Sequence, residues 1–191
     1  VDISDRSLKF AELFLKNDHL ELGQFGSKVM PEGMLASGEI KDKKGLIDFL
    51  KKSFEDFYGR EIILDLPEEK AFLGLVTLPP MPEANIREAL ELQLEEHVPL
   101  SASEAIFDYE LISSPEVKDH LDVILVAFPK TLVEGYRDVV KEAGLNPLVF
   151  EMETQALVRA VWPKDEDGTI MVVDFGRTRT SFAIVSGGII R

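Results

Sequence analysis

The sequence contains no cysteine, and this absence excludes several kinds of site. Disulfide bonds and thiolate metal centres require cysteine, so neither can form within this chain. Histidine is also scarce. The three histidines, His19, His97 and His120, are widely separated and do not have the spacing of zinc ligands. The lack of cysteine fits a reducing compartment.

Basic residues are few compared with acidic ones. Lysine and arginine total 21 against 35 aspartates and glutamates, so the formal net charge is -14. A nucleic-acid-binding protein needs a basic surface to neutralise phosphates, and this balance argues against one. Strong attraction to anionic lipids is disfavoured for the same reason. The negative charge favours solubility and leaves open a basic partner surface.

Long hydrophobic runs are missing as well. No apolar run approaches the roughly 20 residues that span a bilayer, so we expect no direct membrane insertion. The first five residues show no signal-peptide pattern. The chain starts with Val1 rather than methionine and enters a strand-like stretch at once, as a trimmed chain would. Its 191 residues are 45% hydrophobic and 29% charged, which is enough to bury a core.

The first part of the chain predicts an α/β layer. Its helix is indicated by Ile47, Leu50 and Phe54, which recur at helical spacing. Gly and Asn–Asp turn signals separate short apolar-rich stretches before it. The predicted elements are a three-stranded meander over the first 40 residues, a helix over 45–58, and strands over 61–66 and 71–78.

The segment Leu78–Pro82 is predicted to be a boundary, because proline cannot continue a central strand. In the helix that follows, an apolar residue recurs every fourth position, at Ile86, Leu90, Leu94 and Val98. Strands over 105–111 and 121–128, a helix over 131–143 and a strand over 147–151 complete a compact inserted unit. A connecting helix over 154–161 and strands over 169–174, 180–186 and 188–191 then begin another sheet, which leaves an unpaired edge.

One hairpin carries a pattern with chemical meaning. A buried strand ends in Asp174, and Gly176, Thr178 and Thr180 follow it. A tight glycine hairpin can direct backbone N–H groups at a phosphate, and an aspartate at a strand end can hold hydrated magnesium. Taken alone, the pattern is more often an ordinary hairpin in which Gly176 supplies a left-handed residue.

The start of the chain has the same layout of an aspartate, small polar residues and a strand. Two such hairpins, one leading each half, resemble the actin-like ATPase superfamily, in which they hold the nucleotide phosphates from opposite sides. The resemblance implies that a nucleotide contacts Asp2, Ser4, Asp5, Lys9, Asp174, Gly176, Thr178 and Thr180. It also implies that Asp2 and Asp174 hold magnesium.

The middle of the chain resembles the PilM family of actin-like, FtsA-like proteins associated with the inner membrane in type IV pilus assembly. Each matching motif is short, but their order and spacing extend over nearly the whole chain. They are the Leu78–Met81 junction, the acidic helix and proline stop of 91–100, the strand around Asp108, the Ala143–Pro147 turn and the helix of 151–160.

The resemblance implies an α/β fold, with an actin-like (ribonuclease H-like) subdomain over 1–81. A small α+β subdomain of the FtsA/PilM type is inserted over 82–151, and 152–191 hold a connecting helix and the first strands of a truncated second half. The implied function is a cytoplasmic scaffold at the inner-membrane face, reached through partners. It binds the N-terminal tail of a PilN-like inner-membrane protein, with further pilus assembly proteins as other partners. The seam between the subdomains predicts partner contacts at Leu78, Pro79, Met81 and Ile86.

One departure from the family bears on nucleotide binding. Ser4 stands where the family usually has glycine, and Asp5 follows it. A carboxylate beside a phosphate is repulsive unless a cation lies between them. We therefore expect ATP and Mg²⁺ in a full-length form of the protein, and neither to bind tightly to this chain.

The sequence leaves two other functional hypotheses open. The first is a sugar-kinase-like phosphotransferase of the same superfamily, which would need an acidic base beside a sugar pocket. The second is an FtsA-like cell-division protein or a GspL-like secretion protein. The sequence places no such base and has no Ser–His–Asp order, so we expect scaffolding and name no catalytic residue.

Overall fold

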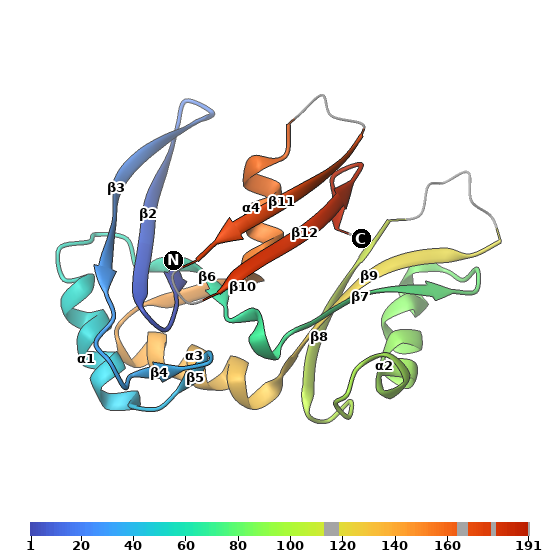
Figure 1. Ribbon diagram of the computed structural model, residues 1–191, viewed down its shortest axis with the longest axis horizontal. Helices are drawn as coiled ribbons and strands as arrows, with labels where there is room; N and C mark the ends of the chain where they lie inside the picture. The colour runs from blue at the N-terminus through green and yellow to red at the C-terminus, as the bar shows by residue number, and fades with distance from the viewer. Residues whose placement is uncertain (113–118, 164–167, 177–178, 191) are drawn as a thin grey trace.

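The computed structural model describes residues 1–112, 119–163, 168–176 and 179–190, and these residues adopt a mixed α/β fold. Figure 1 shows two units side by side, one a sheet with α1 and α3 packed on it and the other a sheet with α2. A third, smaller sheet lies against them. The chain enters and leaves the second unit once, so that unit is an insertion within the first.

The first unit contains a five-stranded sheet in the order β10-β6-β1-β2-β3. Strands β10, β6 and β1 run parallel, whereas β1, β2 and β3 form an antiparallel meander. This meander is the one predicted for the start of the chain. The bounds are β1 (Asp2–Ile3), β2 (Ser7–Lys16), β3 (His19–Val29), β6 (Glu61–Leu66) and β10 (Asn146–Met152).

Two helices, α1 (Lys43–Ser53) and α3 (Lys130–Glu142), cover one face of this sheet. The Asp42 carboxylate starts α1 by accepting a hydrogen bond of 2.9 Å from the Gly45 N–H. The helix ends at Ser53, earlier than the predicted 58, although the apolar spacing continues. Phe54 and Phe57 leave the helix because they pack edge-to-face with Phe10 of β2, at centroid distances of 5.2–5.6 Å.

The second unit has three antiparallel strands in the order β7-β9-β8, with bounds Phe72–Leu78, Leu121–Pro129 and Ala105–Leu111. Helix α2 (Ile86–His97) covers one face of this sheet. The predicted stripe is confirmed as core, because Ile86, Leu90, Leu94 and Val98 are all at most 2% exposed. Burying each of these side chains stabilises the fold by about 1.5–3 kcal/mol.

The sheets do not divide the chain where the sequence suggested. Strand β7 was expected in the first unit, but it pairs along its whole length with β9. Strand β10 was expected in the inserted unit, but it pairs in parallel with β6, and α3 packs into the first core. The inserted unit therefore runs from 72 to 129 instead of 82–151. The prolines after Leu78 end a strand, and apolar periodicity does not reveal which strand pairs with which.

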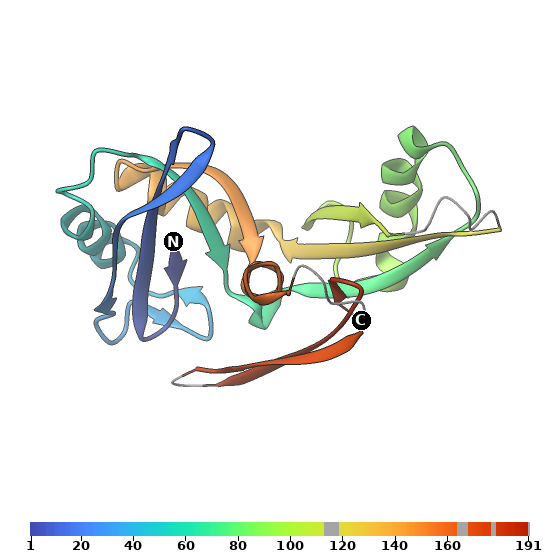
Figure 2. The ribbon, with the colours of Figure 1, turned by 90° about the horizontal axis from the view of Figure 1, so that it is seen from above.

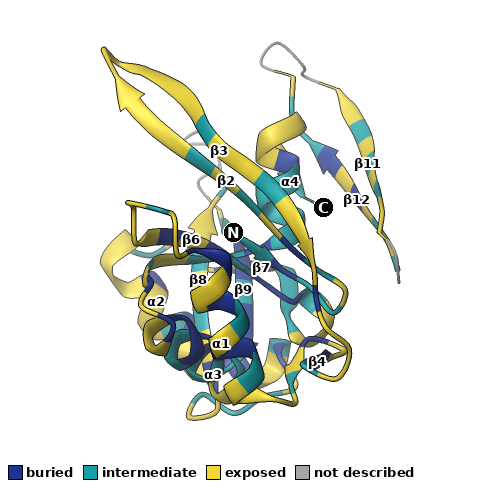
Figure 3. Ribbon diagram, turned by 90° about the vertical axis from the view of Figure 1, so that its left-hand side faces the viewer, coloured by how far each residue is buried: buried dark blue, intermediate teal, exposed yellow. Residues whose placement is uncertain are grey.

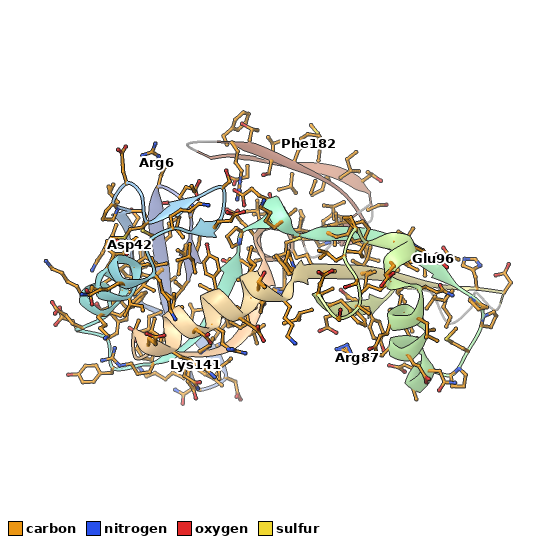
Figure 4. All side chains as sticks on the ribbon, turned by 90° about the horizontal axis from the view of Figure 1, so that it is seen from below. Arg6, Asp42, Arg87, Glu96, Lys141 and Phe182 are labelled. Atoms are coloured by element: carbon orange, nitrogen blue, oxygen red, sulfur yellow. The ribbon has the colours of Figure 1, made fainter. Side chains whose placement is uncertain are left out.

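The third sheet is formed by β11 (Thr169–Phe175), β12 (Thr180–Ser186) and β13 (Ile189–Ile190). It packs on α4 (Glu153–Val161), and Figure 2 shows it as a separate layer. Its other face is apolar and exposed. Phe182 is 72% exposed and points away from the rest of the molecule in Figure 4.

The β2–β3 hairpin is exposed along most of its length, as the yellow ribbon of Figure 3 shows. Four short elements complete the fold: β4 (Leu35–Ala36), β5 (Glu39–Ile40) and the 3-10 helices η1 (Glu68–Lys70) and η2 (Glu83–Asn85). None of the helices in the described part of the chain combines the length and the apolar character needed to cross a bilayer.

Candidate functional site

The two aspartate hairpins meet at one cleft of about 200 Å³ between the first sheet and the third. Six of the eight residues predicted to contact a nucleotide line it: Asp2, Ser4, Asp5, Lys9, Asp174 and Gly176. Thr180 pairs with Phe175 and is exposed outside the cleft. Thr178 lies outside the described residues. One hairpin lies at the start of the chain and the other near its end. They meet only because the first and third sheets lie beside each other.

The Asp2 carboxylate is already engaged by a basic side chain. Lys9 faces Asp2 across the β1–β2 pair, and its Nζ donates to Asp2 Oδ2 over 2.9 Å. The hydrogen bond with Asp2 raises the pKa of the Lys9 ammonium. A magnesium ion or a phosphate at this position would therefore have to compete with an existing ion pair.

Ser4 and Asp5 close local turns of the backbone. The Ser4 N–H donates to the Ser7 carbonyl over 2.9 Å, and the two serine hydroxyls lie 3.0 Å apart. The Asp5 carboxylate accepts hydrogen bonds from the N–H groups of Ser37, at 2.8 Å, and Gly38, at 3.1 Å. Both of these residues have left-handed backbone, with φ of 50° and 74°. In this structure Asp5 thus holds a turn that would otherwise leave two N–H groups unpaired.

Three carboxylates form a row across the first sheet. Asp65 of β6 is in register with Asp2 of β1 on one side and Glu151 of β10 on the other. Burial raises the pKa of Asp65 to about 6; the Val1 amine opposes this, and the Asp2 and Glu151 charges add to it. Sequence reasoning missed Asp65 and Glu151. An aspartate inside the apolar strand at 61–66 was the available signal.

Arg179 fastens the third sheet to the rest of the site. Its guanidinium forms an ion pair with Glu153 at the start of α4, at 2.6 Å, and a second ion pair with Glu69. Nearby, the Ser181 hydroxyl donates to Glu68 over 2.7 Å. Burial and the Asp2 charge raise the pKa of Glu153, and Arg179 partly offsets them.

Gly176 does not have the left-handed backbone that the hairpin pattern suggested, since it is not among the positive-φ residues of the described chain. A different constraint requires glycine there. A Cβ at this position would lie 2.9 Å from the Arg179 carbonyl oxygen, which is closer than real Cβ contacts. The glycine allows two backbone segments of the hairpin to approach each other.

The cleft is acidic, and its basic groups are paired. Six carboxylates line it, from Asp2, Asp5, Asp65, Glu69, Glu153 and Asp174. The three basic side chains among the described lining residues, Arg6, Lys9 and Arg179, each contact a carboxylate. No group of three or more metal-ligating side chains converges within the described residues. A phosphate group in this cleft would therefore meet carboxylates and would need a cation beside it.

A larger groove of about 1040 Å³ lies between the two units. Its floor is the face of the second sheet that α2 leaves uncovered, with Ile106, Ile124 and Phe128. Strand β10, α4 and β13 form the opposite wall. Two strands that lie at sheet edges in the described part of the chain, β8 of the second sheet and β10 of the first, border the groove.

The residues predicted to contact a partner do not line this groove. Leu78 and Ile86 are 1% and 0% exposed and belong to the core beneath α2, so neither side chain can reach a partner. Met81 packs against the same core, and Pro79 is exposed at the end of β7. The groove lies across the sheet from α2, because Ile106 and Ile124 alternate with the residues that α2 covers.

Two solved structures share this fold. A chain of the PilM-PilN type IV pilus biogenesis complex matches 100% of this chain with a TM-score of 0.88 and 22% identity, over 58% of its own length. The cytoplasmic domain of EpsL, an inner-membrane component of the type II secretion system of Vibrio cholerae, matches 98% of this chain. Its TM-score is 0.56 and its identity 15%, over 66% of its length. The predicted α/β fold is thereby confirmed.

The family relationship rests on a comparison of sequences. The family model described as type IV pilus assembly protein PilM matches residues 1–190. This match extends over both units, the cleft and the groove, and it confirms the resemblance carried by the motifs of the middle segment. The chain therefore belongs to the PilM family of type IV pilus assembly proteins.

Proposed function

We propose that this chain is a scaffold of the type IV pilus machinery that holds the N-terminal tail of a PilN-like inner-membrane protein in the groove between its two units. The observation that carries the proposal is the groove itself, an open apolar channel bordered by two free sheet edges. Family membership and the fold shared with a chain of the PilM-PilN complex support it. Such a scaffold would sit at the cytoplasmic face of the inner membrane through its partner.

The groove suits an extended tail with apolar anchors. Ile106, Leu148 and Val149 are 40%, 58% and 44% exposed along its walls, and Phe128 and Ile124 form its floor. Concave junctions between packed units are common binding sites, and peptides dock in them through side chains that fill pockets. Contiguous apolar residues of this kind differ from the single ones that a free surface normally shows.

Charge favours a basic tail. Asp108, Glu110 and Glu151 line the groove together with Arg87 and Arg159, and Arg159 pairs with Glu151. The excess of acid is therefore small in the groove and large over the whole chain, whose formal net charge is -14. A tail that precedes a membrane span on the cytoplasmic side carries lysine and arginine. Complementary charge of this kind raises the association rate at low salt more than it raises the affinity.

The proposal is tested by titrating a synthetic peptide of the PilN-like N-terminal tail from the same organism against the chain. Ile106→Glu places a charge on the apolar wall and should weaken binding about tenfold or more. Leu92→Glu is the matched control, because Leu92 is 81% exposed on α2, outside the groove. Equal affinities for the two variants would place the site elsewhere. No binding at concentrations on the order of hundreds of micromolar, with the fold verified by circular dichroism, would reject the function.

The acidic cleft supports a second, narrower proposal. We propose that this chain does not hold nucleotide tightly, because Lys9 and Arg179 are paired with carboxylates, and that ATP with Mg²⁺ binds a full-length form in which further residues contact it. A bound magnesium ion would supply the positive charge that a phosphate needs beside Asp2 and Asp174. Calorimetric titration of Mg-ATP into this chain should show no tight binding. Magnesium-dependent ATP turnover that is lost in Asp174→Ala would contradict the proposal.

The extent of the family match favours pilus assembly over the two other functional hypotheses, a phosphotransferase and a cell-division or secretion protein. The PilM model matches residues 1–190, which include the inserted unit and the third sheet. The likeness to EpsL is at 15% identity and concerns the fold. For a sugar-kinase-like reaction, two of the cleft carboxylates that the sequence singled out are already engaged, since Asp2 pairs with Lys9 and Asp5 accepts from the turn at Ser37 and Gly38.

A further inference from the structure

The two sheet edges that border the groove differ in their ability to accept another strand. β10 contains Pro147, which has no N–H, and its register with β6 shifts between Pro147 and Val149. Proline and bulges are features that protect an edge from pairing. β8 has neither feature, since its seven residues, Ala105–Leu111, contain no proline and pair with β9 in unbroken register.

The hydrogen-bond phase of β8 decides which backbone groups face outward. The Lys130 N–H donates to the Glu104 carbonyl at one end, and the Ile112 N–H donates to the Asp122 carbonyl at the other, at 2.7 and 2.9 Å. In an antiparallel pair every second residue bonds its neighbour, so the even-numbered residues of β8 bond to β9. Phe107, Tyr109 and Leu111 therefore direct their N–H and C=O groups away from β9. Phe107 and Tyr109 line the groove.

Two polar side chains cover this edge. The Arg87 guanidinium nitrogens lie 3.5 and 3.4 Å from the Phe107 carbonyl oxygen, and the guanidinium carbon lies 5.0 Å from the Phe107 ring centroid. Figure 4 shows Arg87 on the side of the second unit that faces α3. The Asp108 carboxylate accepts from the Tyr109 N–H over 3.0 Å. Both interactions are solvent-exposed and the Arg87 bonds are long, so a backbone strand can displace them at little cost.

We propose that the tail adds to β8 as a fourth strand of the second sheet and replaces the Arg87 and Asp108 contacts with main-chain hydrogen bonds. This inference rests on the proposed function and specifies its geometry. Ile106, Asp108 and Glu110 point to the groove face, so alternate side chains of the added strand face the same floor of Ile124 and Phe128. The bound segment therefore alternates apolar residues and has no proline at the positions that donate to β8.

Amide hydrogen exchange measured by NMR, with and without the tail peptide, tests the geometry. When the peptide is bound, the exchange rates of the Phe107, Tyr109 and Leu111 amides should fall by about tenfold or more. The Ile106 and Asp108 amides already bond to β9 and serve as internal controls, with little change expected.

A set of peptides, each with one N-methylated amide, tests the same point from the ligand side. Affinity should fall about fivefold or more at every second position of the bound segment and change little between them. Arg87→Met removes the competing donor and should tighten binding about two- to tenfold. Arg137→Met on α3 removes the same charge outside the groove lining and is the matched control.

The outcomes separate this inference from the function on which it rests. Binding with unchanged Phe107 and Tyr109 exchange, or with no alternation along the N-methyl series, overturns strand addition and leaves the groove as the site. Weaker binding by Arg87→Met than by Arg137→Met also overturns it, because Arg87 would then contact the peptide instead of covering the edge. No binding by any peptide overturns both.

Discussion

Arg179 and Glu153 form an ion pair of 2.6 Å that ties the start of β12 to the first turn of α4. The two side chains are 31% and 25% exposed, so the pair is mostly shielded from water. The same guanidinium reaches Glu69 on η1. One arginine thus connects three elements that are distant in sequence and sets the position of the third sheet beside the acidic cleft.

We expect Arg179→Met to lower the free energy of unfolding by about 1–2 kcal/mol, because it leaves two partly buried carboxylates without their cation. Urea denaturation measures the change. Arg6→Met is the control: its pair with Glu32 is more exposed, at 45% and 84%, and should be worth about 0.5 kcal/mol or less. Equal losses from the two variants would show that the Arg179 contacts do not hold the third sheet.

Asp65 should make folding stability depend on pH. Its pKa is raised from 3.8 to about 6, so the folded protein binds this proton more tightly than the unfolded chain does. Stability from this group is therefore greatest at low pH and falls as the pH rises through about 6. Asp65→Asn removes a partly buried charge that water screens in part. It should therefore raise the free energy of unfolding at about pH 8 by about 1 kcal/mol.

Urea denaturation over a range of pH tests this expectation. The Asp65→Asn profile should lose its slope in the window between 3.8 and about 6. Asp56→Asn removes an exposed carboxylate outside the sheet and should keep the slope, because Asp65 is unchanged. A slope that persists in Asp65→Asn would mean that other groups in the cleft cause it.

The two faces of α2 should respond differently to truncation. Leu94 is fully buried beneath the second sheet, and Leu94→Ala should cost about 2–5 kcal/mol because it leaves a cavity. Leu92 is on the same helix and 81% exposed, so Leu92→Ala should cost less than about 0.5 kcal/mol. Thermal and urea unfolding of both variants measure the difference. Similar costs would contradict the assignment of the helix faces.

Asp5 should act on stability through the turn at Ser37 and Gly38. Asp5→Ala removes the acceptor of two N–H groups and should cost about 1–2 kcal/mol in thermal unfolding. Asp5→Asn keeps one side-chain acceptor and should cost less. The Tyr136 hydroxyl donates to the Gly38 carbonyl over 2.9 Å, so near-ultraviolet circular dichroism should report the disturbed turn. An unchanged melting temperature would leave Asp5 without this role.

Much of the local structure was predictable from sequence. The strands at 61–66, 105–111 and 180–186 lie at their predicted bounds, and the four apolar positions of α2 are its buried face. The end of α1 was not predictable, since Phe54 and Phe57 keep a helical spacing but pack on Phe10 of another element. Local periodicity does not register such a tertiary contact.

In the candidate sites, too, the sequence predicted local features and missed contacts between distant elements. The two aspartate patterns indicated which hairpins meet at the cleft, since each motif is contiguous in the chain. Asp65 went unnoticed, and Arg179 was taken for an exposed hairpin arginine, because their roles come from strand register and from contacts between distant elements. The predicted seam was a junction of two units, but Leu78 and Ile86 were assigned to it although they are core.

By itself the sequence determined the family, the order of the elements and the buried face of α2, because these depend on residues near one another in the chain. Only the tertiary structure decided that β7 pairs with β9 and β10 with β6. That choice sets the limits of the inserted unit and leaves β8 and β10 as free edges along one groove. Strand partners and register are set by contacts between residues far apart in sequence, and apolar alternation is compatible with many such pairings.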